Sequence, residues 1–119
     1  MVNKNIKVPI YEQYIQIVIC ENVEEEIHLV RKKFPTRIER FEFSGYSEGI
    51  DKFNLLLLNK KYLTDKPFAI STIAHEAFHI TNFIMKRVGI NPDVNNDEAQ
   101  AYLLSWIVEQ TYKEYEKTL

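Results

Sequence analysis

The sequence predicts an α+β fold, in which a small sheet of three or more strands packs on a long helix and on a following C-terminal helix. Three observations support this class. Short runs rich in branched and aromatic residues are typical of strands, and one apolar stripe at helical spacing lies between them. Two long helical patterns then fill the second half of the chain. The predicted order is β-α-β-β-α-α, and the length of 119 residues favours a single domain over residues 1–119.

Three segments are predicted to be strands. Isoleucines alternate with other residues towards the end of residues 8–20, and residues 37–43 form a second candidate. Residues 44–49 carry two of the three glycines and are predicted to be a turn. Residues 53–58 are apolar at both odd and even positions, so this strand is predicted to be central or covered on both faces.

Three helices are predicted from their end signals. Asn22 suits the N-cap of the first helix, and Pro35 ends it. The second helix should begin near Asp65, with a proline in its first turn, and stop at Gly89, which suits the residue after a helix. A third helix over residues 97–117 has an apolar surface broad enough to pack on the second.

The second helix contains the pattern H-E-x-x-H as His75, Glu76 and His79. Positions four apart share one helical face, so both imidazoles can reach one metal ion, with the glutamate beside it. The pattern is a signature of zinc metalloproteases, in which the glutamate is the general base. This helix is apolar nearly all round, which predicts that it is buried and that the three polar side chains need partners.

A catalytic zinc site usually has three protein ligands, so one more is needed. No histidine follows His79, which leaves the carboxylates of Asp93, Asp97, Glu98 and Glu109. The connection between the last two helices is long enough to return the chain beside His79. Glu98 would then face the second helix, which carries the motif, and it is the preferred ligand, with Asp97 as the next choice.

With His75, Glu76, His79 and Glu98 in place, the chain resembles the gluzincin branch of the zincin metallopeptidases. The segment from Glu98 is similar to the E-x-x-A pattern of compact members such as the ImmA/IrrE-like peptidases. The resemblance implies a small sheet stacked on the active-site helix, one Zn²⁺ per chain and a peptide or protein substrate. Tyr102 stands where thermolysin-like members have an aspartate that supports a histidine.

The expected reaction is hydrolysis of peptide bonds by metal-activated water, with Glu76 moving the proton to the leaving amine. Tyr46, Tyr62 and Tyr102 are candidates for stabilising the oxyanion, although packing is the commoner role of a tyrosine. Residues 53–58 could offer a strand edge to an extended peptide, or could be an interior strand.

Other features narrow the class of protein. A net charge of −2 gives no reason to expect nucleic-acid binding, and no segment is apolar enough to span a membrane. Cys20 is the one cysteine and should be a buried thiol, while His28 should be a surface or boundary residue. A cytoplasmic location is expected, because the N-terminus is a poor signal peptide.

Three alternatives stay open. A zincin-like protein-binding or regulatory module could bind zinc without proteolysis. A non-haem iron enzyme could use two histidines and a carboxylate as a facial triad. A metal-free interaction domain would carry the H-E-x-x-H pattern by chance. Glu76 favours hydrolysis over the first two, because neither needs a general base.

Overall fold

One mixed sheet, covered by helices on both faces, forms the centre of the molecule. The computed structural model describes all residues 1–119, and the α+β class predicted from the sequence is confirmed. The elements are β1 (Val2–Lys7), β2 (Tyr14–Cys20), α1 (Val23–Lys33), β3 (Gly45–Ile50), β4 (Phe53–Asn59), a 3₁₀ turn η1 (Lys60–Tyr62), α2 (Lys66–Arg87) and α3 (Glu98–Glu116). The strand order is β1-β2-β4-β3, with β2 and β4 parallel and the outer pairs antiparallel.

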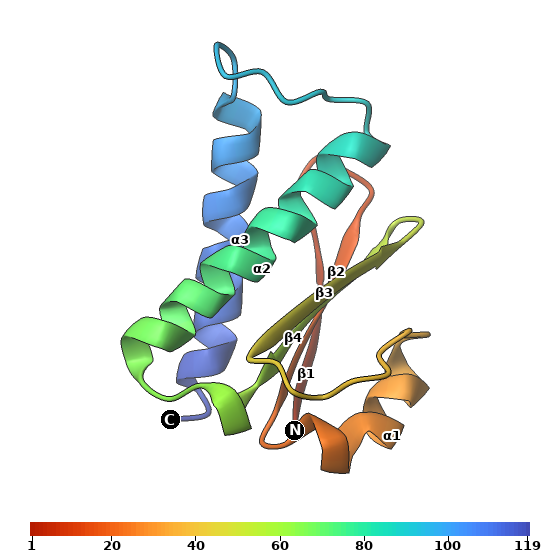
Figure 1. The fold of residues 1–119 in the computed structure, drawn as a ribbon. Coiled ribbons are helices and arrows are strands. Elements are labelled where there is room, and N and C mark those ends of the chain that lie inside the picture. The colour runs from red at the N-terminus through yellow and green to blue at the C-terminus, as the bar shows by residue number, and fades with distance from the viewer.

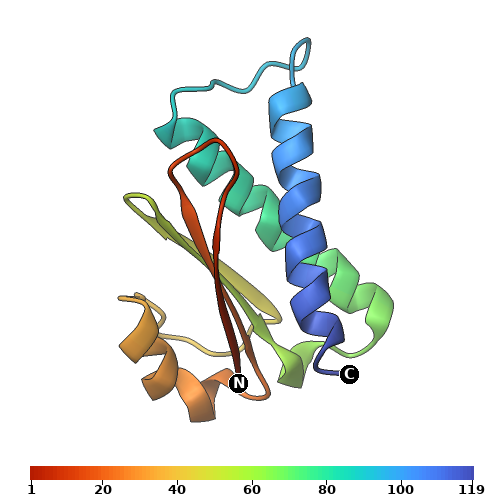
Figure 2. The same ribbon diagram turned by 180° about the vertical axis from the view of Figure 1, so that it is seen from behind.

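The helices lie on opposite faces of this sheet. α1 covers one face, and α2 and α3 pack side by side over the other (Figures 1 and 2). Successive strand residues point to opposite faces, so β4 contributes Leu55 and Leu57 to the core under α1, and Leu56 and Leu58 to the core under α2 and α3. All four leucines are fully buried, which confirms that this strand is central and covered on both faces.

The strand predictions are wrong in two places. Residues 8–20 are not one strand, because the chain turns after residue 7 and β1 pairs antiparallel with β2. Residues 37–43 form no strand, and the next strand is β3, which lies in the stretch predicted to be a turn. The order is therefore β-β-α-β-β-α-α, with four strands. The glycines that suggested a turn lie within β3, where they allow α2 to approach closely.

The helix ends follow the predicted signals. The side chain of Asn22 accepts a hydrogen bond from the Glu24 N–H and caps α1. Asp65 Oδ1 accepts from the Phe68 N–H at 2.8 Å and caps α2, and Gly89 follows that helix with a φ of +82°. No helix of the protein has both the length and the apolar character that crossing a membrane requires.

Burial of α2 departs from the prediction. One side of the helix lies on the sheet and another contacts α3, but a third stripe faces solvent. Phe78 on this stripe is 53% exposed, and both motif histidines are exposed as well. The sheet and α3 cover only two sides of α2. Some of the apolar residues of this helix therefore remain exposed to solvent.

Candidate metal site

His75 and His79 come together on the solvent-facing stripe in the middle of α2. One helical turn separates them, and their rings meet edge to face with centroids 4.8 Å apart. The two Nε2 atoms are 3.2 Å apart. His79 also stacks on Phe83, one turn further on, with centroids 6.5 Å apart. The helix therefore presents two convergent ring nitrogens to solvent.

This separation fits two ligands on one zinc ion. Zinc–nitrogen bonds of about 2.0–2.1 Å to atoms 3.2 Å apart enclose an angle of roughly 100–105°, close to tetrahedral. The same distance also suits a single N–H···N hydrogen bond between a donor ring and an acceptor ring. Imidazole nitrogens are ordinary zinc ligands, so both the geometry and the donor chemistry of this pair suit the metal.

Glu76 lies on the neighbouring stripe, between α2 and β3. Its side chain is only 9% exposed, and Oε2 is 3.9 Å from His75 Nε2. No hydrogen-bond donor of the protein reaches the carboxylate, and His75 is its one ionic neighbour. The Glu76 oxygens are not among the fully enclosed polar atoms that lack a partner, so water can still reach this carboxylate. A structural carboxylate as buried as this normally accepts hydrogen bonds from the protein, and Glu76 accepts none.

Glu98 does not join the histidines in this structure. It is the first residue of α3, and the first turn of α3 lies beside the 88–97 connection, beyond the middle of α2 in both views (Figures 1 and 2). No group of three or more His, Cys, Asp or Glu side chains is arranged to hold a metal ion. Glu98 as the third ligand stays a prediction.

The other carboxylates considered as ligands have different surroundings. Asp93 and Asp97 line the groove of about 690 Å³ between α2, the connection and the start of α3. Glu109 is exposed and forms an ion pair with Lys113 at 3.2 Å. None of them joins a metal-binding group with the histidines.

The tyrosines considered for the oxyanion and the strand considered for the peptide lie in different parts of the fold. The hydroxyl of Tyr46 donates to Glu48 Oε1 at 2.8 Å on the α1 side of β3, so it is already engaged by a structural carboxylate. Burial first and this hydrogen bond second raise the pKa of Tyr46 to about 12. Tyr62 lies in η1, and Tyr102 is 72% exposed on α3. β4 is interior, so the free strand edges of the sheet belong to β1 and β3.

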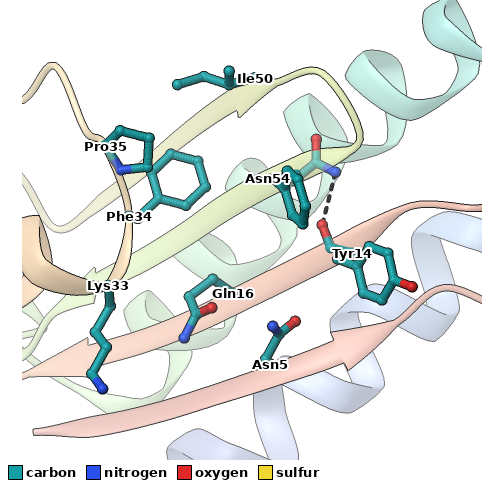
Figure 3. A pocket seen from close by; sticks show the side chains of 9 residues that line it. Asn5, Tyr14, Gln16, Lys33, Phe34, Pro35, Ile50 and Asn54 are labelled. Atoms are coloured by element: carbon teal, nitrogen blue, oxygen red, sulfur yellow. Dashed lines mark hydrogen bonds between the residues drawn. The ribbon is translucent and has the colours of Figure 1, made fainter.

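A separate pocket of about 370 Å³ lies on the α1 side of the sheet (Figure 3). Tyr14 and Phe53 stack in it with ring centroids 5.7 Å apart, and the Asn54 side chain donates to the Tyr14 carbonyl at 3.0 Å. Its lining contains neither histidine nor carboxylate. This pocket therefore has no chemistry in common with the motif, which lies on the opposite face.

The sequence did not predict which residues pack against Glu76. Gly45 lies against both Glu76 and Thr72, and the Thr72 hydroxyl donates to Ser44 Oγ at 3.3 Å. Gly45 was interpreted as part of a turn. The one available signal was the i−4 spacing of Thr72 from Glu76, which places both residues on the same stripe of the helix.

The buried cysteine and the surface histidine are confirmed. Cys20 is fully buried in the core under α1, and burial together with the nearby Glu26 raises its thiol pKa to about 12. His28 is exposed on α1. Neither residue belongs to the motif.

Comparisons with protein-family models, with curated proteins and with solved structures gave no match for this chain.

Proposed function

We propose that this protein is a zinc-dependent metallopeptidase that uses Glu76 as its general base. The observation that carries the proposal is the state of this side chain. It is buried, no protein group donates to it, and it lies beside two histidines whose Nε2 atoms are spaced for one metal ion. Holding a largely buried carboxylate without a protein hydrogen-bond donor gives little stability, and a catalytic role explains why it is there.

His75 and His79 would hold the metal, and Glu98 is the proposed third ligand. The start of α3 is weakly fixed, which supports a role for Glu98 after local adjustment. Asp97 makes no side-chain cap hydrogen bond to the helix, and the residues from 91 to 99 are all exposed. Segments with exposed backbone and few buried contacts open at low free-energy cost.

The chain's own groups suit hydrolysis of a peptide. When bound, zinc would act as a Lewis acid that polarises the scissile carbonyl and lowers the pKa of water. Glu76 would remove the proton of the attacking water and transfer it to the leaving amine. The outer edge of β3 is unpaired and lies beside α2, so an extended peptide could add to it as a further strand.

A zinc-binding module without proteolysis is the second candidate. The observation in its favour is that only two ligands converge, with no third carboxylate beside them. Such a module would act through contacts with a partner protein. A binding module does not need a carboxylate beside the metal. A requirement for Glu76 in peptide hydrolysis would therefore distinguish the two functions.

The test combines metal analysis with one conservative substitution. Protein purified without added metal should contain about one zinc per chain. Glu76→Gln should keep that zinc and lose peptidase activity by a factor of roughly 10²–10⁴. Glu116→Gln, which removes an exposed carboxylate of α3, is the matched control and should retain activity.

Each other outcome selects an alternative. Zinc without any peptidase activity would favour the binding module, and iron in place of zinc would favour the facial-triad enzyme. A protein that binds no metal would leave the H-E-x-x-H pattern as coincidence. Activity retained in Glu76→Gln would overturn the assigned role of the glutamate.

A further inference from the structure

We infer that Gly45 is a positioning residue for Glu76, because its bare backbone is the surface on which the Glu76 side chain rests. The inference rests on the proposed function and adds a residue outside the motif to it. Gly45 opens β3, the edge strand that lies against α2. It does not have a positive φ, so the requirement for glycine here is one of space rather than of backbone conformation.

Side chains on β3 alternate between the two faces of the sheet. Tyr46 and Glu48 point towards the α1 side, where Glu48 meets Thr36. Gly45 and Gly49 point towards α2. A strand with glycines at these positions lets the helix lie unusually near the backbone of the sheet edge.

The contact at Gly45 is too tight for any side chain. A Cβ atom there would lie 2.6 Å from Thr72 Cγ2, 2.8 Å from Glu76 Cγ and 3.2 Å from Glu76 Oε2. Contacts under about 3 Å between such atoms require the neighbours to move. Thr72 is buried and its hydroxyl donates to Ser44, so its freedom to give way is small. Glu76 would therefore have to be displaced in addition to any shift of Thr72.

Displacement matters because the place of the carboxylate depends on this support. No protein donor fixes Glu76, so packing against Gly45 is what keeps Oε2 3.9 Å from His75 Nε2. His75 and His79 lie on the exposed stripe, and the atoms nearest to a Cβ at position 45 belong to Thr72 and Glu76. A methyl group at position 45 should therefore move the base while leaving the two nitrogen ligands in place.

Gly49 provides a matched control on the same strand and the same face. A Cβ atom there would strike Arg87 Nη2, which is the far end of a long side chain. Arg87 also donates to Asn54 Oδ1 at 2.7 Å, so Gly49→Ala will lower stability to some degree. It does so without touching Glu76, and it lacks a positive φ as well.

The first measurement is a double-mutant cycle on metal-free protein. Gly45→Ala, Glu76→Ala and the double variant are compared by thermal unfolding. Glu76→Ala removes the Cγ and carboxylate that the new methyl would strike, so the loss of Tm caused by Gly45→Ala should be smaller in that background. The loss that remains comes from the contact with Thr72 Cγ2. Gly49→Ala combined with Glu76→Ala should be additive. Additive losses for Gly45→Ala would overturn the inference.

The second measurement is the split between kcat and KM. Gly45→Ala should lower kcat by roughly 10–100-fold, with KM and zinc content close to wild type, because a displacement of about 1 Å in a catalytic group has effects of this size. Gly49→Ala should keep kcat within about twofold. Equal kcat values for the two alanine variants would also overturn the inference.

Two precautions keep the result unambiguous. If Gly45→Ala fails to fold, Gly45→Ala combined with Thr72→Ser replaces it, since serine lacks the Cγ2 atom nearest to the new methyl. Failure of the proposed function is detected separately, by an inactive wild-type protein or an active Glu76→Gln. The cycle on metal-free protein reports on the Gly45–Glu76 contact in either case.

Discussion

Two buried glutamates lie on opposite faces of the edge strand β3, one within the strand and one on the helix packed against it, and their surroundings differ. Glu48 points to the α1 side and is 3% exposed, while Glu76 approaches from α2 and is 7% exposed. The carboxylate of Glu48 accepts hydrogen bonds from the Thr36 hydroxyl, the Tyr46 hydroxyl, and the backbone and side chain of Arg37. Glu76 accepts none from the protein.

Glu48 has the surroundings of a structural carboxylate, whereas Glu76 has no partner in the protein and is free for the role proposed above. Burial raises the pKa of Glu48, but the hydrogen bonds from Arg37, Tyr46 and Thr36 outweigh it and hold the pKa below its ordinary value of 4.5. Glu48 therefore ties the chain before β3 to the strand itself. Glu76 makes no such connection. Two carboxylates of similar burial therefore differ in what they contribute to stability, and only Glu76 is left without a protein partner.

The largest expected effect comes from exchanging each carboxylate for an amide. Glu48→Gln should lower the free energy of unfolding by about 2–3 kcal/mol. The NH₂ group of glutamine cannot accept hydrogen bonds, so some donors that the carboxylate satisfied lose their acceptor. Glu76→Gln should change it by no more than about 0.5 kcal/mol, since no protein partner is lost. Chemical denaturation of the metal-free variants measures both values. Equal destabilisation would remove the distinction between the two residues.

A smaller effect is expected from Tyr46→Phe, which removes one of the donors to Glu48. Loss of a hydrogen bond to a charged group should lower the free energy of unfolding by about 1.5 kcal/mol. The raised pKa of Tyr46 adds a second readout. Its stabilising contribution is complete below pH 10 and is lost as the pH rises towards about 12, so wild type should weaken there and Tyr46→Phe should not. Identical alkaline unfolding curves would contradict this.

In acid the contribution of Glu48 to the free energy of unfolding should be lost. A carboxylate whose pKa is lowered by folding stabilises the protein above its unfolded pKa, and that contribution is lost as the pH falls through 4.5 and then through the folded value. The loss should be smaller than the effect of Glu48→Gln, because a protonated carboxyl group can still accept hydrogen bonds. Wild type should show this acid loss in pH-dependent denaturation, and Glu48→Gln should not. If Glu48→Gln shows it equally, another group is responsible.

The smallest effect is expected at Arg37. Its guanidinium group is 3.3 Å from Glu48 Oε2, but the side chain is 78% exposed. Exposed ion pairs contribute little, so Arg37→Ala should lower the free energy of unfolding by about 0.5 kcal/mol or less. The backbone N–H of residue 37 keeps its bond to Glu48 in this variant. A loss as large as that of Tyr46→Phe would show that the ion pair matters more than its exposure suggests.

Local signals predicted local structure well. Asp65, with a proline two residues later, and Gly89 set the ends of α2 through hydrogen bonds and backbone conformation that involve only neighbouring residues. The convergence of His75 and His79 follows from helix geometry alone. The α+β class followed from the same kind of pattern, read over longer segments.

Non-local arrangements could not be read from the sequence. The glycines of β3 indicated a turn, because their reason for being in a strand is the approach of α2 from elsewhere in the chain. The expected return of Glu98 to the histidines depended on the path of the connection. Loop length limits where the next helix can begin but does not choose its position. The connection stays at the end of α2, and α3 starts there.

The central position of β4 has a consequence for how the protein is made. Four consecutive leucines, Leu55–Leu58, are shielded on one face by α1 and on the other by helices that follow in the sequence. During synthesis this strand emerges from the ribosome before α2 and α3, so one of its apolar faces is still exposed to solvent. Runs of this kind are prone to self-association until they are covered. Asn54 and Asn59 at its ends, followed by Lys60 and Lys61, place polar and cationic groups where gatekeeper residues are usually found.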